Sequence, residues 1–313
     1  MKRRTSLYSL PALAAVIIVV AAVLLIHHSG GQSPASAAPS TKTASVSTLL
    51  TRPDLHPPAS TIRLSLPGQA PGLIFIAPKK VFGSKQPVGA QQGQEIIDPK
   101  GKVRYFKPNT GHLVANDFAV QEYEGKPVLT YWYGVQVNGH GNGYDVIEDE
   151  HYHVIATVHA GDGMQADFHE FVLTPQGSAL ITVDHDTTYH GQEVDEGVIQ
   201  EIDVKTGKVL TEWKSLDDVP LSDSYEPKGI RSSAYYDYIH VNAADLDTDG
   251  NILVSARNTW AIYKIQRYTG KLLWTLGGKA SDFKIGPGAN TGWQHDVRSI
   301  GPNLITVFDN GAG

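Results

Sequence analysis

Three histidines stand at similar places in a repeated pattern of strand, tight turn and strand. A neutral imidazole can attack as a nucleophile, and a protonated imidazole can serve as a general acid. An amide and a guanidinium follow the second histidine and would supply hydrogen bonds to an anionic group. The residues of this candidate catalytic set are His169, His240, His295, Asn242 and Arg257.

The motifs around the histidines also contain aromatic residues. Tyr236 and Tyr238 precede His240, and Trp293 precedes His295. Such rings can stack on an aryl substrate, and packing between strands is the alternative explanation for them. An earlier copy of the pattern, Asp117-Phe118-Ala119, has Ala119 where the other copies have histidine.

Hairpins with glycine or polar turns alternate with the histidine motifs. They are predicted over residues 94–105, 144–155, 199–210 and 262–273. Each period of the sequence therefore contains two hairpins, and tandem four-stranded units of ~40–50 residues are typical of a β-propeller. The first strand of every propeller blade lines the central channel, so the histidines are expected to meet on one axis. The predicted fold class is all-β.

The domain of residues 61–313 contains about four such blades and the start of a fifth. The last residues, Phe308-Asp309-Asn310-Gly311-Ala312-Gly313, follow a strand of the innermost type. Because a propeller closes to protect its sheet edges, we expect this sequence to be an incomplete record of a longer, C-terminally truncated protein.

The composition excludes several kinds of function. The 313-residue chain has no cysteine, so disulfides, thiolate metal sites and cysteine nucleophiles are absent. Its formal net charge of -6 argues against nucleic acid as a partner. The run Asp245-x-Asp247-x-Asp249-Gly250 resembles a calcium loop but has Ala256 where an EF-hand has glutamate, so a turn is expected. Neither a metal nor a cofactor is predicted.

The N-terminus predicts export. Lys2-Arg3-Arg4 precedes an uninterrupted run of 15 apolar residues, Ala12 to Ile26, and Ala35-Ser36-Ala37 offers a cleavage pattern. Residues 1–37 are therefore a signal peptide or an uncleaved membrane anchor helix, and both alternatives stay open. Residues 38–60, rich in Ser, Thr, Ala and Pro, are expected to be a disordered linker, with structure beginning near Ile62. The domain is then extracytoplasmic, secreted or attached to the outer face of the membrane.

Together these motifs resemble the bacterial arylsulfate sulfotransferases (ASST type) and their shorter actinobacterial and fungal relatives. The resemblance spans about Gly72 to Gly313 and includes Asn258-Thr259-Trp260-Ala261-Ile262-Tyr263-Lys264-Ile265 and Leu273-Trp274-Thr275-Leu276-Gly277-Gly278-Lys279. It implies a six-bladed propeller that moves a sulfuryl group between phenols without 3'-phosphoadenylyl sulfate. It also implies a transiently sulfated histidine, which falls on His295.

The resemblance places the remaining roles as well. His240 and Asn242 match the family's His-x-Asn pair, Arg257 matches its arginine across a loop one residue shorter, and His169 is the best match for the other channel histidine. The implied partners are a phenolic sulfate donor and a phenol acceptor. The oligomeric state is left open. A non-catalytic exported propeller that binds a small ligand or surface partner is the alternative, and a quinone-type dehydrogenase is a weaker one.

Overall fold

The computed structural model describes residues 17–18, 47, 49–79, 89–228 and 234–311. Within these ranges the chain forms β-strands joined by turns, with one short α-helix and one 3-10 helix. The strands of the first half are β1 (Ile17–Ile18), β2 (Ile74–Ile76), β3 (Gly93–Ile97), β4 (Val103–Pro108), β5 (Val114–Tyr123), β6 (Lys126–Val137), β7 (His140–Glu148) and β8 (Val154–Val158).

The second half follows the same plan. Its elements are β9 (Phe171–Leu173), β10 (Ser178–Tyr189), β11 (Gln192–Asp203), β12 (Val209–Lys214), α1 (Ser215–Asp218), η1 (Leu221–Asp223), β13 (Tyr236–Asp237), β14 (Val241–Leu246), β15 (Ile252–Ala256), β16 (Ala261–Ile265), β17 (Leu272–Gly277), β18 (His295–Gly301) and β19 (Leu304–Phe308).

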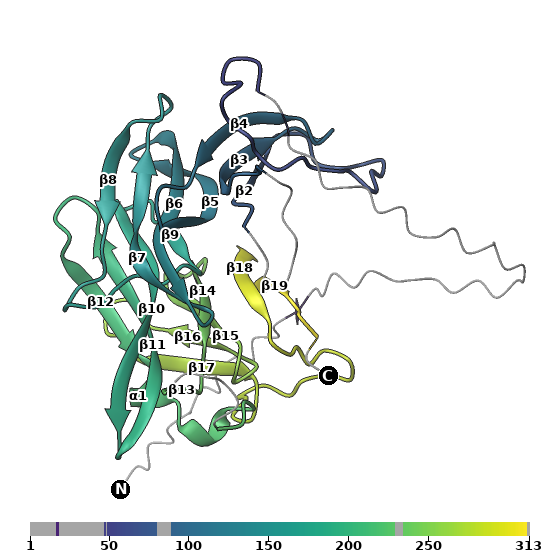
Figure 1. Ribbon diagram of the computed structural model, residues 1–313. Helices are drawn as coiled ribbons and strands as arrows, with labels where there is room; N and C mark the ends of the chain where they lie inside the picture. Colours follow the sequence, from purple (N-terminus) through teal and green to yellow (C-terminus); the bar gives the residue numbers. More distant parts are fainter. Residues whose placement is uncertain (1–16, 19–46, 48, 80–88, 229–233, 312–313) are drawn as a thin grey trace, which may run out of the picture.

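The strands form successive antiparallel sheets, each built from neighbours in sequence. The β5–β8 and β14–β17 sheets have four strands, and the β9–β12 sheet has the same four-strand path with β13 added beside β11. Three strands, β2–β4, precede them, and β18–β19 follow. The predicted four-strand period is therefore present. Figure 1 shows the sheets following one another around an arc.

The first strands of consecutive sheets lie against one another. β2 contacts β5, β5 contacts β9, β9 contacts β14, and β14 contacts β18. Residues at the beginnings of these strands are thereby brought together although they are far apart in sequence. This arrangement is the reason that histidines from three different sheets can share one site.

All four predicted outer hairpins are confirmed, and their turn chemistry explains them. They are the β3–β4, β7–β8, β11–β12 and β16–β17 pairs. The Asp98 carboxylate accepts hydrogen bonds from the backbone N–H groups of Lys100 and Lys102, both at 2.9 Å. Asp149 does the same for His151 and His153 at 2.8 and 2.9 Å. An aspartate that satisfies its own turn in this way favours the reversal of the chain.

The aspartates of the Asp245–Gly250 run form a turn, as predicted. The Asp247 and Asp249 carboxylates each lie 2.6 Å from the Lys264 ammonium on the neighbouring strand β16. The Asp249 carboxylate also accepts the Asn251 N–H at 3.0 Å. These carboxylates are therefore committed to closing the β14–β15 hairpin.

Apolar side chains fill the space between neighbouring sheets. Trp132 and Ile147 of the β5–β8 sheet pack with Ile181 and Val198 of the β9–β12 sheet, and all four are buried. Both faces of each central strand are covered, so these strands carry nearly continuous apolar runs. Burial of this kind stabilises by about 25 cal/mol per Å² of apolar surface.

The structure differs from expectation near the N-terminus. Most of the predicted signal or anchor segment, 1–37, lies outside the described residues, and Ile17 and Ile18 within it form the short strand β1, parallel to β19. An edge strand such as β19 offers backbone groups for this pairing. The predicted N-terminal helix is not shown, and among the described residues no helix is long and apolar enough to span a membrane.

The predicted disordered linker also needs correction where it is described. Leu55, inside the 38–60 range, is buried in a cluster with Ile97, Val103 and Phe106. A large apolar side chain gains more from packing against the β3–β4 hairpin than from exposure to water. Packed structure therefore starts before Ile62.

A buried ion pair links two of the sheets. Arg267, in the β16–β17 turn, donates to both carboxylate oxygens of Glu201 on β11, at 2.8 and 2.5 Å. The two side chains are only 6% and 3% exposed. The fork of a guanidinium on a carboxylate fixes direction as well as distance, so this pair holds the β14–β17 sheet against the β9–β12 sheet.

We expect Arg267→Ala to lower the free energy of unfolding by about 3–5 kcal/mol, because it leaves the Glu201 carboxylate buried without its counter-charge. Urea denaturation followed by circular dichroism measures the change. The exposed Lys271 of the same turn provides a control, since Lys271→Ala should change stability by less than about 0.5 kcal/mol. Equal, small changes in both variants would contradict the structural role of the pair.

Candidate active site

The three predicted histidines lie together at the beginnings of three first strands. His169 comes two residues before β9, His240 comes immediately before β14, and His295 is the first residue of β18. The ring centroids of His169 and His240 are 4.9 Å apart, and His295 is 6.1 Å from His169 and 6.4 Å from His240. The tertiary structure thus brings together residues separated by more than a hundred positions, as the repeat predicted.

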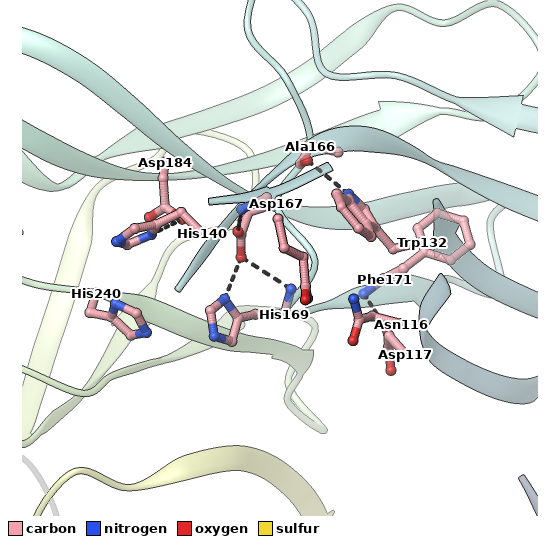
Figure 2. Close-up of polar contacts among 12 residues, drawn as sticks. Asn116, Asp117, Trp132, His140, Ala166, Asp167, His169, Phe171, Asp184 and His240 are labelled. Carbon is pink, nitrogen blue, oxygen red and sulfur yellow. Dashed lines mark hydrogen bonds and ion pairs between the residues drawn. The ribbon is translucent and has the colours of Figure 1, made fainter. Parts of the chain in front are cut away.

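Each of the three rings is held through Nδ1. His240 Nδ1 lies 2.8 Å from the Asp237 carboxylate. His169 Nδ1 is bonded to the Asp167 carboxylate, as Figure 2 shows. His295 Nδ1 lies 2.8 Å from the Trp293 carbonyl, and a carbonyl can only accept, so this nitrogen carries the hydrogen. In the neutral rings the lone pair therefore resides on Nε2, where a nucleophile or metal ligand needs it.

A fourth histidine belongs to the cluster and was not predicted. His140 opens β7, the third strand of its sheet, and its ring centroid is 4.9 Å from that of His240. Its Nδ1 lies 2.5 Å from Asp184, and its Nε2 lies 3.2 Å from Asp195 and 3.3 Å from Asp237. The repeat pattern marks the first strand of each sheet, so it gives no signal for His140 on a third strand. In the sequence this residue is only a histidine between two glycines. We call His140, His169, His240 and His295 the histidine cluster.

His140 is a partly buried cation that lies among carboxyl groups. Burial opposes its charged form, but the charges and hydrogen bonds of Asp184, Asp237 and Asp195 outweigh burial and raise the His140 pKa to about 12. Burial raises the pKa of Asp195 to about 9, although the nearby His140 opposes this effect. Burial opposes the charge of Asp237 also, but the adjacent His240 and His140 hold its pKa well below the usual range. His140 therefore supports the charged Asp237 that orients His240.

The rings of His240 and His295 both have lowered pKa values, in contrast to that of His140. Burial lowers the pKa of His240 to about 4 despite the nearby Asp237 carboxylate. Burial also lowers the pKa of His295, and the positive charge of Arg257 adds to that effect. Both rings are consequently neutral at pH 7 with available lone pairs.

The lowered pKa values of His240 and His295 predict how kcat/KM falls at acid pH if catalysis needs both rings neutral. A lowered pKa means that protonation, and loss of the lone pair, occurs below the ordinary imidazole value of about 6.5. The rate should therefore hold constant as pH falls from 8 to about 6.5 and decline only below it. A pH profile of kcat/KM measures this, with circular dichroism at each pH to show that the fold persists. An acid limb centred at or above 6.5 would contradict the assignment.

Arg257 and Trp293 form one wall of the site. The guanidinium carbon of Arg257 lies 4.4 Å from the centroid of the Trp293 ring, which is 38% exposed. The backbone N–H of Arg257 donates to the backbone carbonyl of His240 at 2.9 Å. This hydrogen bond holds Arg257 next to His240. A guanidinium stacked on an indole beside His295 is placed to meet an anionic group.

Asn242 has a contact that its sequence position did not predict. It is buried on β14, and its amide N–H donates to the backbone carbonyl of Gln294 at 3.0 Å. Gln294 in turn donates to the carbonyls of Ala256 and Ala261 at 2.9 and 3.0 Å. Asn242 thereby positions the residue next to His295. Its contact with a sulfuryl oxygen stays a prediction.

The predicted aromatic contacts need a correction. Tyr238 is completely buried in the core, and its hydroxyl donates to Ser215 at 2.8 Å, so its ring cannot stack on a substrate. Tyr238 lies in the bend between β13 and β14 and packs in a core cluster with Ile199 and Trp213. Tyr236 is half-buried on β13, and its hydroxyl donates to the Glu226 carbonyl at 2.8 Å. Trp293 is the predicted aromatic residue that lies beside the histidine cluster.

The earliest copy of the motif also needs a correction. Asn116 pairs with Trp132 and Ala119 pairs with Thr130 across an irregularity in β5. His295 pairs with Phe308 and Arg298 with Thr306 across the same irregularity in β18. Asn116, and not Ala119, therefore stands where β18 has His295. The Lys79 ammonium donates to the Asn116 amide oxygen at 2.8 Å.

An ion pair between Arg298 and Glu170 lies in the interior near the histidine cluster. Arg298 on β18 donates to both carboxylate oxygens of Glu170 at 2.7 and 3.1 Å. Burial raises the pKa of Glu170 to about 8 even beside this arginine. The pair connects β18 to the segment before β9, and neither residue was predicted.

Comparison with known proteins agrees with this site. A model of the family described as arylsulfotransferase (ASST) matches residues 119–312, a range that contains the histidine cluster, Asn242 and Arg257. The chain belongs to the arylsulfotransferase (ASST) family, which confirms the resemblance found in the sequence. No curated protein matches the chain.

Among solved structures, the chain is similar to a protein of unknown function from Bacteroides caccae. The two are 15% identical, with a TM-score of 0.39. The similarity covers 70% of this chain and 64% of the Bacteroides caccae chain.

Proposed function

We propose that this protein is an exported aryl sulfotransferase that moves a sulfuryl group from a phenolic sulfate ester to a phenolic acceptor. The observation that carries the proposal is the set of three rings, His169, His240 and His295, each held at Nδ1 and grouped beside Arg257. Family membership supports the reaction class. We also propose that the sheets are blades of a six-bladed β-propeller with the site in its central channel, and that residues 1–37 direct export.

The first half-reaction forms a covalent intermediate at His295. The Nε2 lone pair attacks the sulfur, the bond between sulfur and the aryl oxygen breaks, and the phenolate leaves with the electron pair of that bond. Sulfuryl transfer is similar to phosphoryl transfer, in which positioning and charge stabilisation do most of the catalysis. The Nδ1–H of His295 faces the Trp293 carbonyl at 2.8 Å, which stabilises the positive ring of the sulfohistidine. Arg257 binds the sulfuryl oxygens.

We assign the acid and base role to His169. Its Nδ1 is bonded to the Asp167 carboxylate, which leaves Nε2 to carry the proton that it gives to the departing phenolate. His240, with a pKa lowered to about 4, is neutral and lies beside His169, with ring centroids 4.9 Å apart, so it lines the position of the acceptor. In the second half-reaction His169 takes the phenol proton, the acceptor oxygen attacks sulfur, and the bond from sulfur to Nε2 breaks. The enzyme returns to its starting protonation state.

The test uses the full chain with p-nitrophenyl sulfate. Nitrophenol release should depend on an added phenol, and mass spectrometry without acceptor should show a protein heavier by one sulfuryl group. Peptide mapping should place that group on His295. Absence of both release and mass gain would sink the enzymatic proposal in favour of a binding function. Release without any phenol, at the same rate, would indicate hydrolysis instead of transfer.

A further inference from the structure

We propose that the Nε2 atoms of His169, His240 and His295 bind one divalent transition-metal ion of the Zn²⁺ class. One ligand atom from each of these residues lies within 4.8 Å of the others. Nitrogen ligands of a tetrahedral zinc ion are about 3.3 Å apart, given bonds of about 2.0–2.1 Å. Small side-chain rotations close the difference. Three histidines and one open position form a known arrangement for this ion.

The support behind the rings is also that of a metal site. Histidines that ligate a metal donate their other ring N–H to a carboxylate or a backbone carbonyl. His240 does so to Asp237 at 2.8 Å, and His295 to the Trp293 carbonyl at 2.8 Å and to Asn310 at 2.9 Å. His169 does so to Asp167. With Nδ1 held in this way, each ring leaves its Nε2 as the ligand atom, and one ligand atom of each residue lies within 4.8 Å of the others.

The charges around the three rings permit a cation. The carboxylates of Asp167 and Asp237 contact the rings of His169 and His240 directly. Asp237 also lies 3.3 Å from His140 Nε2. Acidic side chains therefore stand directly behind two of the three ligand rings, which favours a bound cation.

The ligand type selects the ion. Imidazole nitrogen suits Zn²⁺, Cu²⁺ and Ni²⁺, whereas Mg²⁺ and Ca²⁺ prefer oxygen ligands. Imidazole nitrogens bind a metal in the neutral form, so binding releases any proton that they carry. The site should therefore discriminate between Zn²⁺ and Mg²⁺ at equal concentration.

Metal binding has a consequence that rests on the proposed function. The lone pair of His295 that would attack sulfur is the one that would coordinate the metal. Zn²⁺ should consequently inhibit sulfuryl transfer in competition with the sulfate donor, and a chelator should restore the rate. The binding itself is measured without substrate, so the metal site and the transferase activity can fail separately.

The experiment is isothermal titration of the chelator-treated full chain with ZnCl₂ and, separately, MgCl₂. We expect saturable binding of one Zn²⁺ per chain at micromolar concentration and no binding of Mg²⁺. His240→Ala and His169→Ala should each weaken Zn²⁺ binding about 100-fold or more, and Asp237→Asn, which removes only the support of His240, about 10–100-fold. Circular dichroism confirms that each variant is folded.

Matched controls test whether other histidines bind the metal. Replacing the exposed His112 with alanine should leave Zn²⁺ affinity unchanged. The same result is expected when His27 and His28, which are consecutive in the sequence, are replaced, and when the exposed His151 and His153 are replaced. Absence of Zn²⁺ binding in the wild type would overturn the proposal. So would full binding by a folded His169→Ala, His240→Ala double variant. A tetrahedral visible spectrum of the Co²⁺ form, lost in that double variant, would be independent support.

Discussion

Replacing His295 with alanine is expected to abolish the sulfohistidine and to lower the transfer rate by about 10³-fold or more. Removal of a nucleophile from a set of residues that act as a unit typically costs at least this much. The ring is half-buried, and its Nδ1 contacts are to a backbone carbonyl and to Asn310, so alanine removes the lone pair while leaving the backbone of β18 in place. Nitrophenol release and the intact protein mass measure the two effects.

The control for this substitution is His112→Ala, an exposed histidine away from the cluster, which should keep the wild-type rate. His295→Gln provides a second variant of similar size, so that loss of activity is not confused with loss of packing. If a folded His295→Ala protein still gained a sulfuryl group on another histidine, His295 would not be the nucleophile. His169 or His240 would then take that role.

The second large effect is expected from Asp167→Asn. Asp167 is 1% exposed, and its carboxylate is bonded to His169 Nδ1 and accepts the backbone N–H of Gly141 at 2.5 Å (Figure 2). An asparagine is nearly the same size but removes the negative charge that His169 Nδ1 contacts. Loss of a positioned general acid costs about 10²–10⁴-fold, and we expect kcat to fall within that range.

The leaving group distinguishes an acid role from a structural one. Phenyl sulfate has a more basic leaving group than p-nitrophenyl sulfate and needs protonation more. Asp167→Asn should therefore slow transfer from phenyl sulfate much more than transfer from p-nitrophenyl sulfate. Asp186→Asn, at an exposed carboxylate on β10, should affect neither donor. Equal losses with both donors would show that Asp167 supports the fold and not the proton transfer.

The repeat in the sequence was sufficient to predict the strands and the shared site. Each outer hairpin carries a glycine or polar turn, and turn chemistry of this kind is local, so the four hairpins could be recognised without knowledge of their neighbours. A four-strand period then implies that first strands meet. The four-strand period therefore predicts that His169, His240 and His295 lie together.

Local patterns did not reveal the support around the histidines. His140 comes from a third strand, and Asp184 and Asp195 that hold it lie on β10 and β11 of the next sheet. Whether a third-strand residue reaches the site depends on how far β6 and β7 extend past the other strands. The Arg267–Glu201 pair has the same origin, since the β16–β17 turn and strand β11 are distant in sequence and meet only after the sheets have packed.

By itself, the sequence determined the all-β class, the hairpins and the family. It also predicted that three histidines share one site. These depend on alternation, turn residues and repetition, which act over a few residues at a time. Only the tertiary structure decided which side chains face the site and which face the core. It buried Tyr238, turned Asn242 toward Gln294 and assigned an acceptor to each Nδ1. Side-chain direction and protonation depend on neighbours from other sheets, which no local pattern in the chain specifies.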